Sequence, residues 1–307
     1  FNMTSDSGLF QTATMLNADG WERDGTDWAR GPEHMVPLYA GTMIHQYDHR
    51  WATYVGEDSR DLTYSEKQSP NSDACPRYWV PRNLVDDILS TRDWNRGWLM
   101  GWRDITNSTN ERTTIAAAFP HAGVGNNLPL MFFNKNLNSR KIILLLAGLS
   151  SLTSDFFARH KVGGTHLNFF IFQQITALPP TAYSESALAF IVPRVLELSY
   201  TSHSMAPFAS DLGYDGPPFA WDEDRRANLR AELDAWYALA YGLTRDELRY
   251  VLDPKDVMGA DYPSETFRVL QKNEIAKHGE YRTRRLVLAA YDALVTSGMR
   301  PRTEGYR

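Results

Sequence analysis

The sequence predicts an α+β fold, in which a mixed or antiparallel sheet with a long buried helix precedes a mainly helical C-terminal part. Up to about residue 180, short runs rich in Trp, Tyr, Ile and Val alternate with Gly, Asn and Pro, a pattern typical of strands and turns. One apolar stretch, residues 139–160, is long enough for a buried helix, and helical periodicity dominates after residue 180.

The strands of the first part are predicted from alternation and from β-branched and aromatic content. Residues 97–105 alternate Trp98, Met100 and Trp102 with small or polar neighbours, as a half-buried strand does. Residues 37–55 predict a strand, a turn and a second strand. Further strands are expected at residues 113–119, 128–133 and 167–172.

Helices are predicted where apolar residues share one helical face. Residues 81–89 begin with Pro and place Leu84, Ile88 and Leu89 together. The helix over 139–160 is expected to end at Gly163 and Gly164. Its apolar run, 142–152, is too short to span a bilayer, so we expect no membrane association. Later helices are predicted at residues 184–198, 222–241, 244–252, 264–277 and 282–295.

A linker rich in Pro and Gly, residues 205–221, separates the two parts. We therefore expect a mixed α/β domain over residues 1–205 and a helical domain over residues 206–307.

Composition narrows the function. A formal net charge of −5 argues against a wholly cationic surface but leaves a local basic patch open. The single cysteine, Cys75, excludes an internal disulfide framework and indicates a reducing, cytoplasmic compartment. The chain starts with Phe1 and shows no signal peptide, so we expect a piece of a longer protein.

Motifs for catalysis are weak. The segment HQYDH holds His45, Asp48 and His49, but in a strand the two histidines would be ~13 Å apart. The segment GVGNN, residues 123–127, lacks the further residues of a phosphate-binding loop and predicts a β-turn. We expect no catalytic residue and no metal site, and a metal-dependent hydrolase using HQYDH stays as an alternative.

Two polar stretches carry side chains suited to DNA. Asn amides pair with adenine, Arg with guanine, and hydroxyl groups with phosphates or base edges. The candidate DNA-binding residues are Arg103, Thr106, Asn107, Thr109, Asn110 and Arg112 in the first stretch, and Lys161, Thr165, His166 and Asn168 in the second. The alternative is that these Asn and Thr side chains only cap turns.

The segments RDITNSTNERTTIAAAFP, GVGNNLPL and KVGGTHLNFFIFQQITALPP, with the later MAPFASDLGYDGPPFAWDEDRRANLRAELDAWYALAYGLTRDELRYVLD and KHGEYRTRRLVLAAYDAL, resemble a known family. The family is the C-terminal target-recognition region of large adenine-specific DNA methyltransferases. These occur in type IIG restriction-modification enzymes and in BREX and DISARM phage-defence systems. The resemblance covers most of the chain from about Pro37 onward.

The resemblance implies a division of labour. An upstream domain would bind S-adenosylmethionine and methylate a flipped adenine, and this region would select the DNA sequence. The Asn-Pro-Pro-aromatic signature and the glycine-bearing cofactor motif of that domain are absent here, as is a convincing nuclease motif. The chain is therefore expected to need no cofactor and to be non-catalytic in isolation. Its expected partners are double-stranded DNA and the upstream methyltransferase domain.

A second hypothesis is a protein-interaction scaffold that docks the methyltransferase core or a defence-complex partner. It predicts salt-insensitive binding and an exposed apolar patch, whereas DNA recognition predicts binding that weakens steeply with salt. The arginines of two helices, Arg225, Arg226, Arg230, Arg282, Arg284 and Arg285, are expected either to touch phosphates or to form solvated faces partnered by Glu223, Asp224 and Glu232.

Overall fold

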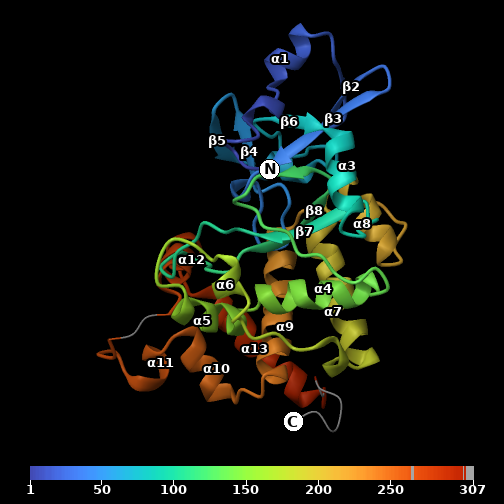
Figure 1. Cartoon of the computed structure of the whole chain (residues 1–307). Helices are drawn as coiled ribbons and strands as arrows, with labels where there is room; N and C mark the ends of the chain where they lie inside the picture. The colour runs from blue at the N-terminus through green and yellow to red at the C-terminus, as the bar shows by residue number, and fades with distance from the viewer. Residues whose placement is uncertain (264–265, 300, 302–307) are drawn as a thin grey trace. The chain divides into compact units, whose positions relative to one another are not determined.

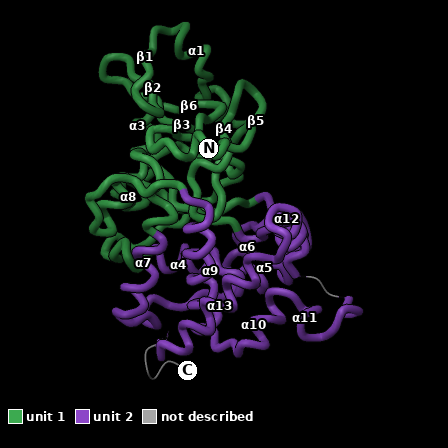
Figure 2. Tube along the Cα trace, turned by 180° about the vertical axis from the view of Figure 1, so that it is seen from behind, with its two compact units in different colours: residues 1–104, 115–142, 196–221 green, residues 105–114, 143–195, 222–307 purple. Residues whose placement is uncertain are grey.

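The computed structural model describes residues 1–263, 266–299 and 301, and its chain forms two compact units (Figures 1 and 2). Unit 1 comprises Phe1–Asp104, Ile115–Ile142 and Leu196–Trp221. Unit 2 comprises Ile105–Thr114, Ile143–Val195 and Asp222–Arg307. Both units therefore combine segments from either side of residue 205, where the sequence predicts one boundary. The fold is α+β, with a helical C-terminal part.

Unit 1 is built on a sheet with the strand order β1-β2-β3-β6, to which β9 is added by pairing with β3. All pairs are antiparallel except β3 with β9. These strands span Glu22–Asp24 (β1), Asp27–Arg30 (β2), Glu33–Tyr39 (β3), Trp79–Pro81 (β6) and Gly123–Val124 (β9). Leu16, Trp28, Met35 and Trp79 form a buried cluster beside the sheet.

A close approach fixes Gly123 in β9. A Cβ at this position would lie 2.6 Å from Cγ2 of Val80, closer than packed atoms allow. Leu38 of β3 pairs with Gly123, so the GVGNN segment enters the sheet before it turns. The predicted turn follows, and the Leu128 amide donates to the Gly125 carbonyl at 3.0 Å.

Two further hairpins complete the strands of unit 1. The first pairs β4 (Ala52–Val55) with β5 (Asp58–Asp61), and the second pairs β7 (Trp98–Trp102) with β8 (Ala116–Pro120). The prediction of two strands within residues 37–55 is confirmed, but β4 pairs with β5 and not with β3. The helices of unit 1 are α1 (Ala13–Ala18), α2 (Tyr64–Gln68), α3 (Arg82–Ser90) and α8 (Ala206–Asp211), with 3-10 turns η1 (Ser7–Leu9), η2 (Gly41–Met43) and η4 (His203–Met205).

Three local predictions in unit 1 need correction. Strand β7 is buried along its whole length and not on one face only. Residues 128–133 form no strand, because Pro129 has no amide proton and only Leu130 bridges to Gly101. Helix α3 begins after Pro81 as predicted, but it buries Val85 and Leu89 and leaves Ile88 exposed.

Unit 2 is helical, and each helix predicted after residue 180 is present. They are α7 (Glu185–Ser199, which ends in unit 1), α9 (Glu223–Ala240), α10 (Arg245–Leu252), α12 (Arg268–His278) and α13 (Arg282–Thr296). The expected start of α12 at Ser264 falls outside the described residues. This part of unit 2 also contains helix α11 (Lys255–Met258) and the 3-10 turn η3 (Pro180–Ala182). Helices α9 and α13 pack against each other.

The predicted long helix over 139–160 is two helices, α4 (Ser139–Ser150) and α5 (Leu152–Lys161), with a 62° bend between them. Ser151 at the break is extended, and its hydroxyl caps α5 by accepting from the Ser154 amide. The Leu152 amide donates to the Asp234 carboxylate at 2.7 Å. The break is therefore stabilised because its freed amides find acceptors.

Residues 167–172 were expected as a strand but contain the short helix α6 (Phe169–Phe172), capped by the Asn168 side chain. Helix α5 ends on an extended Val162, so Gly163 and Gly164 are not its stop. Within the described residues, no single helix has the length and hydropathy of a membrane span. Helices α4 and α5 have that length and hydropathy only when they are taken together, across the bend between them.

Candidate nucleic-acid interface

The two predicted polar stretches meet in unit 2. Residues 105–114 form a loop between β7 and β8, and residues 161–168 follow α5. The Thr106 amide donates to the Thr165 carbonyl at 3.0 Å, and Ile105 and His166 form an antiparallel bridge. Segments about 60 residues apart in sequence thus lie side by side.

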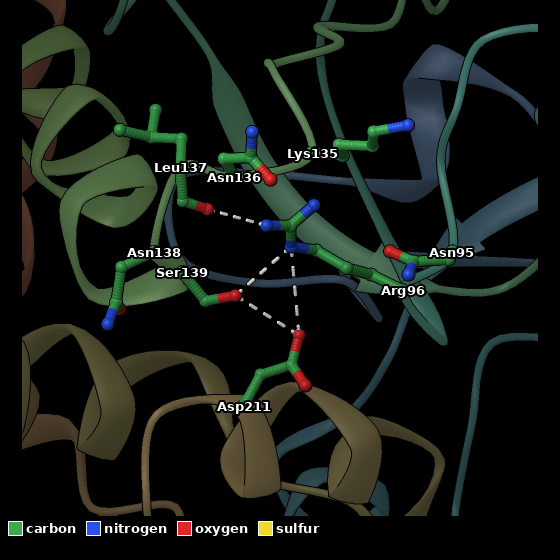
Figure 3. Close-up of a pocket in the computed structure, with 8 residues that line it drawn as sticks. All are labelled: Asn95, Arg96, Lys135, Asn136, Leu137, Asn138, Ser139 and Asp211. Atoms are coloured by element: carbon green, nitrogen blue, oxygen red, sulfur yellow. Dashed lines mark hydrogen bonds and ion pairs between the residues drawn. The ribbon is translucent and has the colours of Figure 1, made fainter.

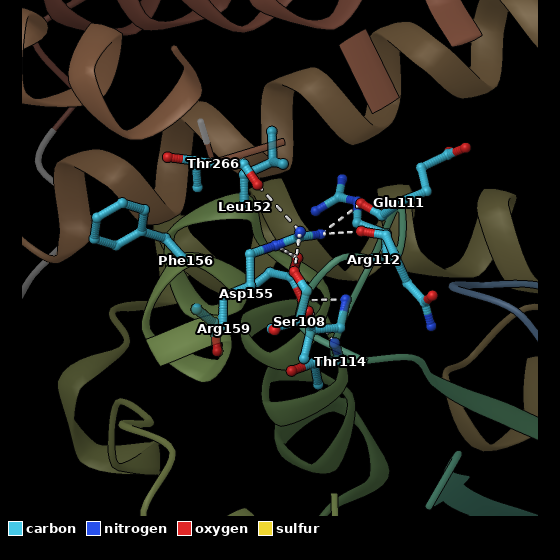
Figure 4. Close-up of polar contacts among 12 residues, drawn as sticks. Ser108, Glu111, Arg112, Thr114, Leu152, Asp155, Phe156, Arg159 and Thr266 are labelled. Carbon is cyan, nitrogen blue, oxygen red and sulfur yellow. Dashed lines mark hydrogen bonds and ion pairs between the residues drawn. The ribbon is translucent and has the colours of Figure 1, made fainter. Parts of the chain in front are cut away.

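The loop over residues 105–114 is held from inside by Arg159 of α5 (Figure 4). Its guanidinium donates to the carbonyls of Ser108 (2.8 Å), Asn110 (2.8 Å), Glu111 (2.7 Å) and Thr266 (3.1 Å). The side chain is only 6% exposed, and this burial lowers its pKa. One planar group thus binds three carbonyls of the loop from its inner side.

Asp155, one turn before Arg159, fixes the end of the same loop. Its Oδ1 accepts from the amides of Thr113 (2.9 Å) and Thr114 (2.6 Å), and its Oδ2 lies 3.0 Å from Nε of Arg159. The carboxylate is fully buried. A buried carboxylate is stable only when it is paired and hydrogen-bonded, and here all these contacts come from the loop and from Arg159.

Arg112, a predicted DNA contact, is turned inward. Its Nη2 lies 3.8 Å from Oδ2 of Asp234, and both side chains are at least 93% buried. Burial raises the pKa of Asp234 to about 6, although Arg112 acts in the opposite direction. The Arg112 side chain thus supports the loop and does not form part of its exposed face.

Arg103 and Thr106 also bond inward. Arg103 lies in unit 1, where Nε donates to the Ile44 carbonyl at 2.8 Å and Nη2 reaches the Thr42 carbonyl at 3.2 Å. Burial lowers the pKa of Arg103 to about 10. The buried hydroxyl of Thr106 donates to the Thr113 carbonyl at 2.7 Å.

The tip of the loop carries Asn107, Thr109 and Asn110. The half-buried Asn107 accepts from the amide and the hydroxyl of Thr109, both at 2.9 Å, in an Asx turn. Thr109 and Asn110 are exposed. Asn107 therefore shapes the turn, and Asn110 presents its amide to solvent.

In the second stretch all four predicted residues, Lys161, Thr165, His166 and Asn168, are exposed. Lys161 is the last residue of α5, and Asn168 accepts from the Ile171 amide at 3.0 Å to cap α6. Apolar side chains border this surface: Ile105 is 55% exposed, Phe169 59% and Phe170 75%. The surface therefore combines hydrogen-bonding groups with large apolar ones.

The three predicted arginines of α13 are paired to acids. Arg282 binds Asp224 at 2.9 Å, Arg285 binds Glu280 at 2.7 Å, and Arg284 lies 3.5 Å from Asp253. Of the other expected acids, Glu223 binds Lys277 and Glu232 binds Arg194. Arg226 is buried, and burial lowers the pKa of Arg230. Pairing to acids within the chain is what a solvated face predicts.

The HQYDH segment forms a turn and not a flat strand. His45 and Asp48 exchange backbone hydrogen bonds of 2.7 and 2.9 Å, and Asp48 binds Lys67 at 2.6 Å. His49 is buried, with Nε2 2.7 Å from the Ser202 hydroxyl. Across the described residues, no group of three or more His, Cys, Asp or Glu side chains is arranged to hold a metal ion.

The site is supported by Arg159, Asp155 and Asp234. The sequence pattern does not predict this role for them. One signal was present for Asp155, which is an acidic residue among small and apolar ones in the segment SSLTSDFFA. Charged residues at such positions are buried only with partners. The partners themselves lie about 40 to 80 residues away, so the pairing is not visible in the sequence.

Comparisons with protein-family models, with curated proteins and with solved structures found no match to this chain.

Proposed function

We propose that this chain is the DNA sequence-recognition part of an N6-adenine DNA methyltransferase from a restriction-modification or phage-defence system. In this proposal it acts in the cytoplasm and is non-catalytic by itself, and S-adenosylmethionine binds in an upstream domain. The supporting observation is that residues 105–114 and 161–168 lie side by side and expose polar side chains, with the first segment held by Arg159.

The exposed groups suit different parts of a duplex. The Asn110 amide can donate to and accept from an adenine edge, and His166 and Thr165 can bond to base edges or phosphates. Lys161 supplies a positive charge for a phosphate. Because Arg159 and Asp155 fix the loop before DNA arrives, little ordering entropy would be lost on binding.

The test is selection of this chain on a pool of random duplexes at low and moderate salt, with sequencing of the recovered DNA. We expect enrichment of a short asymmetric motif that contains adenine, and binding that weakens steeply as salt rises. Asn110→Ala and His166→Ala should remove the enrichment. Asn71→Ala, an exposed asparagine in unit 1, is the matched control and should not.

A second candidate function, docking of a protein partner, is favoured by the exposed Phe169, Phe170 and Ile105. The expected partner is the methyltransferase core or another defence-complex protein. This function predicts association that is insensitive to salt and is weakened by Phe170→Ser. Absence of DNA binding at every salt concentration would favour docking over DNA recognition.

A further inference from the structure

Unit 1 contains a cavity of about 450 Å³ (Figure 3). Its lining includes Arg96, Lys135, Asn136, Ser139 and Asp211, and it is formed where α4 begins. This volume falls within the range of small-molecule sites, and it is large enough for a phosphate group with its substituents.

Arg96 is the central group of the cavity. Its side chain is 91% buried, with Nε 3.1 Å from the Ser139 hydroxyl and Nη2 2.6 Å from the Leu137 carbonyl. Its third nitrogen, Nη1, is buried and has no hydrogen-bond partner among the residues that the structure describes. Figure 3 shows the guanidinium among Lys135, Asn136 and Leu137. The guanidinium also lies over the Trp94 ring, with Cζ 4.9 Å from the ring centroid, but a ring face is only a weak acceptor. A buried donor without a full acceptor is costly, so a ligand oxygen at Nη1 would stabilise this arrangement.

The helix that starts here has a cationic first turn. Helix α4 begins Ser139-Arg140-Lys141 and has no acidic residue in that turn. The positive end of a helix dipole favours anions and disfavours cations, and α4 therefore begins with the unfavourable charge. Arg140 and Lys141 do not line the cavity, but their charges add to those of Arg96 and Lys135 near the start of the helix, which favours an anion there.

Asp211 is the acid that faces this cluster. Its Oδ2 lies 3.8 Å from Nε of Arg96 and accepts from the Ser139 hydroxyl at 3.1 Å and from Nε1 of Trp98 at 2.9 Å. Asp93 lies 3.7 Å from Nζ of Lys135, in a solvent-exposed pair of the weak kind. Asp211 thus holds Arg96 in place through Ser139, and it competes with an anion without reaching Nη1.

We propose that this cavity binds a phosphate group, with Nη1 of Arg96 and Nζ of Lys135 as donors and the start of α4 as an electrostatic contributor. The phosphate is either free inorganic phosphate or a phosphodiester of a DNA backbone. All residues of this cavity belong to unit 1, and free phosphate tests the site without DNA.

The test is calorimetric titration of the whole chain with inorganic phosphate, dimethyl phosphate and a 12-base-pair duplex as separate probes. We expect saturable binding of at least one of the two small phosphates. Lys135→Ala and Arg96→Gln should weaken it about tenfold, the loss typical of one charge-assisted hydrogen bond. Asp211→Asn keeps an acceptor for Ser139 and removes the competing charge, so it should tighten phosphate binding severalfold.

Lys272→Ala is the matched control, because Lys272 is an exposed lysine of α12 in unit 2. Preference for dimethyl phosphate, with loss of duplex affinity in Lys135→Ala, identifies the phosphate as a DNA backbone group. Preference for inorganic phosphate, without an effect on the duplex, identifies a free ion. No saturable binding of either small phosphate overturns the site, as does an equal loss in Lys272→Ala. If Arg96→Gln fails to fold, the phosphate affinities of Lys135→Ala and Asp211→Asn test the site in its place.

Discussion

Asp155 and Arg159 lie one helical turn apart in α5, and their side chains meet with Oδ2 3.0 Å from Nε. Through this pair the helix binds the middle and the end of the loop over residues 105–114: Arg159 donates to its middle carbonyls, and Asp155 accepts from its last amides. The pair is therefore the support of the candidate DNA-binding surface.

Removing Arg159 should destabilise unit 2 strongly. Arg159→Met leaves the Asp155 carboxylate buried without its cation, a change that typically costs about 3–5 kcal/mol. We expect a lower denaturant midpoint and faster amide exchange over residues 105–114. Arg285→Met removes an exposed ion pair with Glu280 and should leave the midpoint unchanged. Equal effects of the two variants would contradict the support role.

Substitutions of Asn110 and Arg112 should affect different properties, the first DNA affinity and the second the free energy of unfolding. Asn110→Ala alters an exposed side chain, so it should weaken DNA binding by about tenfold or more without changing the free energy of unfolding. Arg112→Met, which removes the partner of Asp234, should lower the free energy of unfolding. Filter binding and urea unfolding of both variants test this. A stability loss in Asn110→Ala would count against an exposed recognition role.

Asp234 should give unit 2 a pH dependence. Its folded pKa of about 6 lies above the ordinary value of 3.8, so the folded chain holds this proton more tightly than the unfolded chain. Its contribution to stability therefore falls as the pH rises from about 4 to about 6, by on the order of 1–3 kcal/mol. Asp234→Asn should remove this slope, as urea unfolding across pH 4–7 would show. An unchanged slope would mean that the folded pKa is not raised.

Gly101 and Gly163 differ in the space around them. A Cβ on Gly101 would lie 2.5 Å from the Pro129 carbonyl oxygen, so Gly101→Ala should destabilise unit 1 by about 1–3 kcal/mol. Gly163 has no described atom within 4 Å of such a Cβ, and its φ is not positive, so Gly163→Ala should leave stability unchanged or slightly higher. Thermal unfolding compares the two. Close approach of DNA to the backbone at Gly163 predicts that Gly163→Ala lowers DNA affinity without lowering stability, a combination not expected of Gly101→Ala.

The sequence by itself determined the α+β class and the helices after residue 180, because helical periodicity and caps such as Thr244 are local properties. It also identified both polar stretches of the candidate site. The tertiary structure decided which of their side chains are exposed. Arg103 and Arg112 turn inward to the Ile44 carbonyl and to Asp234. These partners lie about 60 and 120 residues away along the chain, so the sequence alone does not show the orientation of either side chain.

The same reason explains the break in the predicted long helix, whereas residues 167–172 differ from the predicted strand for a local reason. The pattern over residues 139–160 is continuously helical, but the chain breaks at Ser151 because Asp234 of a distant helix accepts the freed Leu152 amide. Residues 167–172 are apolar enough for a strand, yet Asn168 caps a helical turn there and Phe170 stays exposed. Local pattern sets what a segment can form, and partners far along the chain decide what it forms.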